Sequence, residues 1–337
     1  MANLHASYMG IELKNPIIAG ASEITKNVQS IKKLEEAGAA ALVTKSLFEE
    51  QVQLERFQLE EEATMYSDRH AQMTSLFPQM EHAGPQEHLM WVKKSKEAVN
   101  IPVIGSLNCV NHDTWIEYAK MMQDTGVDGL ELNFYASPCD AALSGASIEN
   151  EQVVTAEEVV KAVSIPVSVK LSMFYSNPLN VISRFDLAGV KGVVLFNRFF
   201  QPDFDIEKER NTLPFNLSNT IDSRVPLRFA GLLYGNLQAD VCSSTGIFEG
   251  SDVIRMLLAG AGCVQVVSTL FVNKITHLQH MLQDLEVWMD GKGYSALADF
   301  RGKMSKKNSH DPWSYERSQY VKLLFEAENI IKTTPLV

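Results

Sequence analysis

Four times along the chain, a turn containing Gly leads into a short apolar run that ends on a polar residue. The four segments are residues 37–45, 125–133, 188–197 and 259–268, and they end at Lys45, Asn133, Asn197 and Ser268. In each segment the Gly is typical of a helix end, and the apolar run is typical of a buried parallel strand. The carboxyl ends of the strands of a parallel barrel share one face, where such proteins build their active sites. The pattern therefore predicts both the fold and the position of the functional site.

Four further apolar segments are candidate strands, at residues 15–21, 101–108, 165–172 and 240–247. Helical patterns lie between the strands. We expect helices over residues 27–37, 113–125, 155–163 and 251–259, which begin at Asn27, Asp113, Thr155 and Ser251, and one long helix over residues 271–289. Thr155 and Glu158 have the spacing of a capping box. This alternation is typical of an α/β protein with either a doubly wound sheet or a barrel. Eight strands and four repeated units favour a (β/α)8 TIM barrel.

Two long segments interrupt the alternation, at residues 46–90 and 198–239. Each follows a predicted strand, so we expect both insertions to lie over the carboxyl face of the barrel, where long loops are usually functional. Neither segment has the features of an independent domain. The sequence thus predicts one domain over residues 1–337.

Charge and composition exclude several classes of protein. The net charge of −11 argues against nucleic acid or an anionic membrane as a partner. We find no apolar run long enough to span a membrane and no signal peptide at the start of the chain. The four scattered cysteines fit a reduced, cytoplasmic protein. His70, His82 and His88 have no metal-binding spacing, so we expect a solvated loop there and no metal site.

Two lysines, Lys45 and Lys170, fall at the ends of predicted barrel strands. A buried lysine without a carboxylate nearby is costly, so each needs a negative partner or a function. Three interpretations are open: a salt bridge across the barrel mouth, a contact with an anionic or polarised oxygen of a ligand, or a Schiff-base lysine as in barrel aldolases.

Asn133 and Asn197 also end predicted strands, and Glu131 points the same way as Asn133. Amide side chains both donate and accept hydrogen bonds, which suits a planar heterocycle. The alternative is that each Asn caps the turn that follows its strand. Finding two lysines and two asparagines at equivalent positions favours the ligand-binding interpretation.

The last two predicted strands lead into small-residue turns, at residues 243–250 and 266–271. Small residues let backbone N–H groups approach an anion, and a helix N-terminus favours its charge. A phosphate site after strands seven and eight recurs in TIM barrels. The sequence therefore predicts an anion site at these turns.

Several motifs together resemble the dihydroorotate dehydrogenases. They are NPIIAGAS (15–22), VTKS (43–46), GLELN (129–133), IPVSVKLS (165–172), VLFN (194–197), TGIFEG (245–250) and YSALADFRGKM (294–304). Their order and spacing resemble that family over nearly the whole chain up to residue 304. The chain is most similar to the soluble class, and within it to a divergent, dihydroorotate dehydrogenase-like branch.

The resemblance implies that flavin mononucleotide (FMN) binds at the mouth of a TIM barrel. The implied cofactor contacts are Gly20, Ala21, Ser22, Lys45, Ser46, Asn108, Asn133, Lys170, Asn197, Thr245, Gly246, Ser268 and Thr269. Lys170 would stabilise negative charge on the reduced flavin, and the phosphate would lie near Thr245, Gly246, Ser268 and Thr269. Asn133, Asn197 and Arg198 would contact the substrate.

The substrate half of the site departs from the family pattern. The catalytic base of the family would fall on Ser137, or on Cys139 as second choice, while Ala136 takes its place if no residue is inserted. The family's substrate-clamping loop is replaced by MTSLFPQMEHAG at residues 73–84, and Arg198 replaces a small hydroxyl residue. Arg198 suits an anionic group because its guanidinium can bind a carboxylate in a bidentate manner.

We therefore expect an FMN-dependent oxidoreductase that oxidises a CH–CH bond, in dihydroorotate or in a related reduced anionic substrate. Its implied setting is cytoplasmic pyrimidine biosynthesis, with a soluble electron acceptor such as fumarate or a quinone and a homodimeric assembly. Two alternatives stay open. One is a non-flavin lyase or aldolase that uses Lys45 or Lys170, and the other is a flavin-binding protein that has lost dihydroorotate activity.

Overall fold

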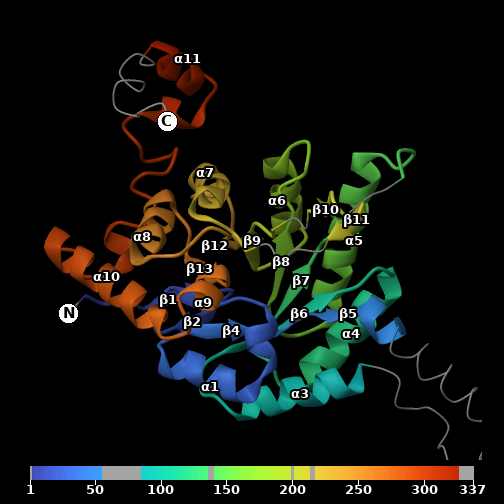
Figure 1. The fold of residues 1–337 in the computed structure, drawn as a ribbon. Helices are drawn as coiled ribbons and strands as arrows, with labels where there is room; N and C mark the ends of the chain where they lie inside the picture. Colours follow the sequence, from blue (N-terminus) through green and yellow to red (C-terminus); the bar gives the residue numbers. More distant parts are fainter. Residues whose placement is uncertain (1, 55–84, 136–139, 199–200, 213–216, 326–337) are drawn as a thin grey trace, which may run out of the picture.

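The computed structural model describes residues 2–54, 85–135, 140–198, 201–212 and 217–325 (Figure 1). Its central sheet contains β3 (Ile17–Ala19), β4 (Ala41–Val43), β6 (Val103–Asn108), β7 (Gly129–Asn133), β8 (Val167–Leu171), β9 (Gly192–Leu195), β12 (Asp240–Ser244) and β13 (Cys263–Val266). These strands pair in parallel in chain order, and β13 pairs with β3, so the sheet closes on itself. The predicted TIM barrel is confirmed.

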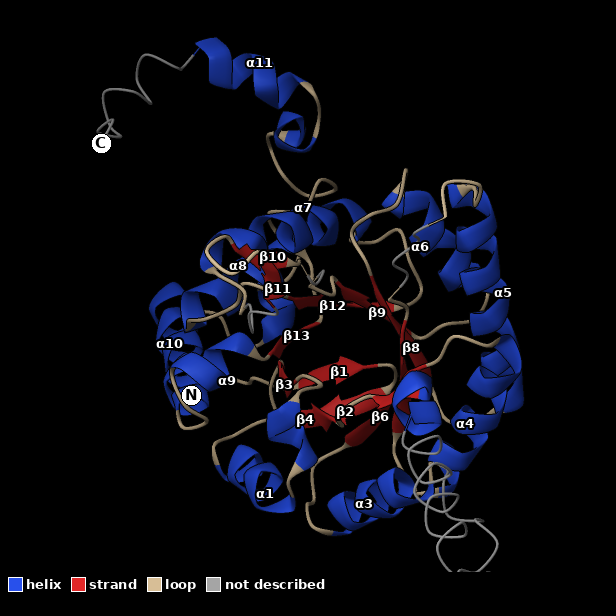
Figure 2. Ribbon diagram, turned by 45° about the vertical axis from the view of Figure 1, so that its right-hand side comes forward, coloured by secondary structure: helices blue, strands red, loops and turns tan. Residues whose placement is uncertain are grey.

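Helices surround the barrel, as Figure 2 shows. They are α1 (Val28–Glu36), α3 (Gln86–Glu97), α4 (His112–Asp124), α5 (Gly145–Ala162), α6 (Pro178–Leu187), α7 (Arg224–Leu233), α8 (Gly250–Ala259) and α10 (His277–Lys292). Each buries apolar side chains, such as Val253 and Met256 of α8, against the strands. The barrel strands are therefore covered on their outer faces, which explains why their sequences do not alternate between apolar and polar residues.

One predicted helix start is confirmed, and another is wrong. Helix α1 follows Asn27, whose side chain accepts a hydrogen bond from the Gln29 backbone N–H at 2.8 Å. Helix α5 begins at Gly145 rather than at Thr155, because the Ser144 side chain caps its first turn by accepting from the Ser147 backbone N–H. Thr155 lies buried inside this helix, so its spacing to Glu158 is not a start signal.

Three other helix boundaries also differ from the sequence prediction. Helix α4 begins at His112, one position before Asp113, and α8 begins at Gly250, one position before Ser251. The single helix expected over residues 271–289 is two helices, α9 (Ser268–Val272) and α10. Lys274 lies between them with a φ of 70°, and this left-handed conformation cannot continue a right-handed helix.

A hairpin of β1 (Ala6–Tyr8) and β2 (Ile11–Leu13) lies against the amino-terminal end of the barrel. Tyr8 and Met9 pack there with barrel residues such as Val194. Gly192 makes room for this hairpin, because a Cβ at that position would lie 2.7 Å from the Tyr8 ring. The hairpin closes this end, so the carboxyl end is the mouth of the barrel.

The remaining elements are short. They are β5 (Leu47–Phe48), β10 (Asp203–Asp205), β11 (Arg210–Thr212), the 3-10 turns η1 (Glu23–Lys26), η2 (Thr220–Ser223), η3 (Leu297–Asp299) and η4 (Pro312–Tyr315), and α11 (Ser318–Phe325). The second predicted insertion contains the β10–β11 hairpin and η2, and α7 of the helical ring also lies within that range. Among the described residues, no helix is both long and apolar enough to cross a membrane.

Candidate active site

The barrel mouth brings together polar side chains from strands far apart in the sequence. Asn133 ends β7, and in the sheet register it lies opposite Lys170 of β8. Asn197 follows β9, and its amide N–H donates to the Asn133 side-chain oxygen at 2.7 Å. The two amides therefore bond to each other, with no side-chain bond to a turn among the described residues, which argues against the turn-capping interpretation.

Lys170 is nearly enclosed, with 7% of its surface exposed. Within the described part of the chain, its Nζ donates one hydrogen bond, to Gln265 Oε1 at a distance of 3.5 Å. This contact is at the outer limit for a hydrogen bond. A buried ammonium group normally needs stronger partners than that. Lys170 is thus well placed to donate to a ligand at the mouth.

Lys45 has a different environment from Lys170. It lies just beyond β4 and forms a salt bridge to Glu23 at 2.5 Å, with 22% of its side chain exposed. The salt-bridge interpretation left open by the sequence thus applies to Lys45. The neighbouring Ser46 hydroxyl shares a hydrogen bond of 2.7 Å with the Ser106 hydroxyl.

The turn after β3 is closely packed at Gly20 and reaches a cavity at Ala21. A Cβ on Gly20 would lie 2.8 Å from a Val267 methyl group, so this position is closely packed on the barrel side. Ala21 lines a cavity at the mouth, and the Ser22 hydroxyl is buried without a partner among the described residues. An unsatisfied buried hydroxyl is a natural contact for a bound polar molecule.

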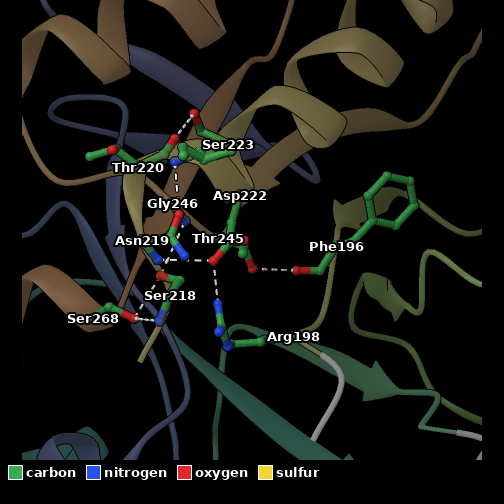
Figure 3. Close-up of polar contacts among 11 residues, drawn as sticks. Phe196, Arg198, Ser218, Asn219, Thr220, Asp222, Ser223, Thr245, Gly246 and Ser268 are labelled. Atoms are coloured by element: carbon green, nitrogen blue, oxygen red, sulfur yellow. Dashed lines mark hydrogen bonds and ion pairs between the residues drawn. The ribbon is translucent and has the colours of Figure 1, made fainter. Parts of the chain in front are cut away.

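The turns after β12 and β13 form a hydrogen-bonded group with a segment that precedes α7 (Figure 3). Thr245 and Gly246 both have a φ of 76°, and the Thr245 hydroxyl donates to the Phe196 carbonyl at 2.9 Å. The Gly246 N–H donates to the Ser218 hydroxyl oxygen at 3.2 Å, and the Ser218 hydroxyl donates to Ser268 Oγ at 2.7 Å. The predicted anion-binding turns are therefore side by side.

Sequence reasoning missed Ser218. It lies in the polar second insertion, where nothing in the local pattern separates it from its neighbours. The structure places its backbone N–H 3.0 Å from Ser268 Oγ and its hydroxyl between two turns of the barrel. This position depends on the return of the insertion to the barrel mouth, which local sequence spacing does not reveal.

Arg198 links the same insertion to the end of β9. Its guanidinium forms an ion pair with the Asp222 carboxylate, which also accepts from the Asn219 N–H at 2.9 Å (Figure 3). Arg198 also lines the cavity at the mouth. The Thr269 hydroxyl, by contrast, donates to the Phe248 carbonyl at 3.0 Å, so its hydrogen bond is directed toward the start of α8.

Two cavities open at the mouth. The first, here named the β12–β13 cavity, has a volume of about 180 Å³. Its lining includes Ala21, Lys170, Asn197, Arg198, Ser218, Thr245, Gly246, Gln265 and Ser268. The second, here named the β6–β7 cavity, has a volume of about 450 Å³ and includes Asn108, Cys109, Trp115, Phe134, Tyr135 and Gln152. Of the predicted cofactor residues, Asn108 lines the second cavity, and Ala21, Lys170, Asn197, Thr245, Gly246 and Ser268 line the first.

A third cavity, of about 210 Å³, lies between Lys45 and α3. His88 of α3 lines it together with Lys26, and its Nε2 is buried without a hydrogen-bond partner among the described residues. Burial and the charges of Lys45 and Lys26 lower the pKa of His88 to about 4. His88 is therefore neutral at physiological pH, and it is not part of the solvated loop that the sequence suggested.

The residues considered as catalytic base, Ser137 and Cys139, lie outside the described residues, as do Ala136, His70 and His82. Across the described ranges, no group of three or more His, Cys, Asp or Glu side chains is arranged to hold a metal ion.

Comparison with known proteins identifies the family. The sequence model described as "Dihydroorotate dehydrogenase" matches residues 76–289. The chain is 26% identical over 278 residues to the catalytic subunit of dihydroorotate dehydrogenase B (NAD(+)) of Methanocaldococcus jannaschii, covering 80% of this chain and 87% of that protein. It is 24% identical over 311 residues to the same subunit of Shouchella clausii, covering 90% and 98%. It is also 24% identical over 213 residues to dihydroorotate dehydrogenase A (fumarate) of Lactobacillus helveticus, covering 61% and 68%. The chain belongs to the dihydroorotate dehydrogenase family.

Proposed function

We propose that the protein is an FMN-dependent oxidoreductase that oxidises a CH–CH bond, in dihydroorotate or in a related reduced anionic substrate. The observation that carries this proposal is the environment of Lys170. This side chain is 93% buried, has one long hydrogen bond among the described residues, and lines a cavity bordered by hydroxyl and amide groups. Such a lysine suits a ligand that gains negative charge during the reaction.

The polar groups around the β12–β13 cavity fit FMN. The Ser218 and Ser268 hydroxyls and the turn at Thr245 and Gly246 would hold the phosphate. Lys170 would donate to the polar edge of the ring, together with the paired amides of Asn133 and Asn197. The Ser22 hydroxyl, buried and unpartnered among the described residues, would complete the contacts. Bound FMN would supply the hydride-accepting chemistry.

The substrate would lie toward the β6–β7 cavity, which begins at Asn108 and has aromatic and amide lining. We propose Ser137 as the base that removes the substrate proton, with Cys139 as second choice, and Lys45 as a catalytic lysine beside the ring. Arg198 would contact an anionic substrate group, in competition with its ion pair to Asp222. This partly exposed ion pair orients the guanidinium before a ligand arrives.

We further propose a soluble electron acceptor, a homodimeric assembly and a cytoplasmic role in pyrimidine biosynthesis. The names of the relatives support two kinds of acceptor, NAD(+) and fumarate. Size-exclusion chromatography with light scattering would test the dimer. Reoxidation of the substrate-reduced protein by fumarate, a quinone or NAD(+) would identify the acceptor.

The decisive experiment is a visible absorption spectrum of the purified protein, followed by anaerobic addition of dihydroorotate. A flavin spectrum that bleaches supports both the cofactor and the substrate. A flavin spectrum that does not bleach removes dihydroorotate and leaves other reduced anionic substrates. A protein that neither contains nor takes up FMN overturns the proposal. In that case, borohydride trapping of a carbonyl substrate on Lys45 or Lys170 would test the aldolase alternative.

A further inference from the structure

A chain of three polar side chains crosses the barrel interior beneath the mouth. Lys170 of β8 donates from its Nζ to Gln265 Oε1 of β13 at 3.5 Å. The amide N–H of Gln265 in turn donates to Glu131 Oε2 of β7 at 2.5 Å. Gln265 therefore reaches from β13 across the barrel and bridges an ammonium group and a carboxyl group that stand on the neighbouring strands β8 and β7.

The carboxyl group of Glu131 is poorly satisfied for a buried acid. Glu131 is 0% exposed and Gln265 is 1% exposed. The second carboxyl oxygen, Oε1, has no hydrogen-bond partner among the described residues. Burial raises the pKa of Glu131, while the charge of Lys170 and the hydrogen bond from Gln265 act to lower it. The charge of Glu131 is thus tied to the charge of Lys170.

The other titratable groups around Glu131 do not replace Lys170 as a partner. Tyr8 of β1 and Cys242 of β12 are both fully buried, and burial is the main cause that raises the pKa of each well above its usual value. Both therefore stay neutral at ordinary pH, as uncharged neighbours. Cys263 of β13 belongs to the same buried group. Lys170 is accordingly the cation that compensates an ionised Glu131.

We propose that Glu131 is a positioning residue for Lys170, which it holds through Gln265, and that Glu131 takes up a proton when negative charge develops on a ligand beside Lys170. This inference rests on the proposed binding of FMN. While the site carries no extra negative charge, the Glu131 carboxylate balances the Lys170 ammonium. When the ligand becomes negative, the Lys170 ammonium group faces two anions, the ligand and the Glu131 carboxylate. Protonation of Glu131 then leaves the full positive charge of Lys170 to stabilise the ligand.

The charges balance in the proposed reaction. Bound FMN would accept a hydride, which is two electrons and one hydrogen, from one substrate C–H bond. The proton from the adjacent carbon would pass through the proposed base to solvent, and its departure would leave one added negative charge at the mouth. A proton from solvent then binds the Glu131 carboxylate, so the barrel interior keeps its total charge.

The first test uses the full chain without FMN. The infrared carbonyl band of a protonated carboxyl is recorded against pH for the wild type and for Glu131→Gln. We expect a titrating band that is absent from Glu131→Gln. In Lys170→Met and Gln265→Leu the midpoint of this band should rise, because each change removes an interaction that favours the charged carboxylate. A titration unchanged by Lys170→Met would overturn the linkage, whatever the cofactor.

The second test uses the FMN-loaded protein and measures the reduction potential of the flavin against pH. We expect the wild type to take up one more proton for each two electrons than Glu131→Gln does. The reduction potential of the variant should therefore change less steeply with pH. A purely structural role for Glu131 would leave the slope unchanged, and that result overturns the proposal. Failure to bind FMN would instead contradict the proposed function, because the infrared test does not depend on the cofactor.

Ser243→Ala is the matched control for both tests. Ser243 lies in β12, is fully buried in the barrel, and has a hydroxyl without a partner among the described residues. Its loss disturbs the barrel to a similar degree but leaves the three side chains in place. For Ser243→Ala we expect the infrared titration and the pH dependence of the reduction potential to match those of the wild type. A change as large as that in Glu131→Gln would overturn the assignment to Glu131.

Discussion

The two sides of the barrel mouth are built differently. Around β12 and β13, Ser218 bonds directly to both Gly246 and Ser268, and the cavity that these residues line has a volume of about 180 Å³. Around β6 and β7, the cavity holds about 450 Å³, and Asn108 faces it without a side-chain hydrogen bond among the described residues. On the first side the lining residues bond to one another. On the second, the printed bonds of Val110 and Gln152 go to Glu49 and Tyr175, which do not line the cavity.

This difference suggests two separate tasks. The β12–β13 side suits a ligand group that stays the same, and the β6–β7 side suits a ligand that can differ between relatives. A preformed set of donors costs little to organise and suits a fixed partner such as a phosphate. An open space with aromatic walls can change its ligand through a few substitutions. The same contrast occurs in the sequence, because the motifs shared with the family lie mostly on the β12–β13 side and at the strand ends. The departures lie in the segments that follow β4 and β7, and at Arg198 after β9.

The largest effect is expected for Gly246→Ala, on the preformed side. The residue has a φ of 76°, and a Cβ there would lie 2.3 Å from the Ser223 backbone N. Backbone strain and the forced shift of η2 should together lower the free energy of unfolding by about 4 kcal/mol. Gly126→Ala is the control, since its φ is 86° but nothing lies within 4 Å of the added Cβ. Urea denaturation should show that Gly126→Ala lowers the free energy of unfolding by about 1 kcal/mol. An equal loss in the two variants would contradict the close packing at Gly246.

The next effect concerns His88, near the open side. Its pKa of about 4 lies below the value of about 6.5 in an unfolded chain. Between these two pH values the imidazole is protonated in the unfolded chain but neutral in the folded protein. The free energy of unfolding therefore falls as the pH drops from about 6.5 to 4, by about 3 kcal/mol in total. His88→Gln should remove this part of the pH dependence in urea denaturation, whereas His5→Gln, at an exposed site, should retain it. An unchanged pH profile in His88→Gln would show that His88 is not buried as described.

Lys170→Met acts where the two sides meet. The loss of a charge-assisted hydrogen bond should weaken FMN binding roughly 10- to 100-fold, as measured by flavin fluorescence titration. Lys161→Met is the control, because Lys161 lies on the surface of α5 and pairs with Glu157. Equal FMN affinity in the two variants would remove Lys170 from the cofactor site.

The smallest effect is expected for Arg198→Ala. Its ion pair to Asp222 is partly exposed, with 28% and 30% of the two side chains accessible. Such pairs contribute about 1 kcal/mol or less. A double-mutant cycle with Asp222→Asn would measure the coupling between the two side chains. A coupling energy of zero at low salt would show that the pair does not hold the Ser218 segment in place.

Much of the fold could be predicted from the sequence because it depends on local signals. Gly residues end helices, and apolar runs between them form buried strands, so Lys45, Asn133 and Lys170 could be placed at the mouth. The helix boundaries were less predictable. The Thr155 spacing satisfies a capping rule inside a continuing helix, and the break at Lys274 comes from a left-handed residue that is not Gly.

The contacts that complete the site could not be predicted, since they join distant segments. Ser218 reaches Gly246 and Ser268 only after the insertion has returned to the barrel. The ion pairs of Lys45 with Glu23 and of Arg198 with Asp222 likewise depend on the approach of separate loops. The bridge through Gln265 spans the barrel interior, and its residue type alone gives no sign of that role.

The β1–β2 hairpin that closes the amino-terminal end of the barrel has a consequence for the synthesis of this chain on the ribosome. Tyr8 and Met9 leave the ribosome well before the residues that they contact in the barrel, which include Gly192 and Cys242. Translation at roughly 5–20 residues per second delays those partners by about ten seconds or more. During that time the hairpin of β1 and β2 lacks the barrel residues against which it packs, so it reaches its final position only after the later strands have been made.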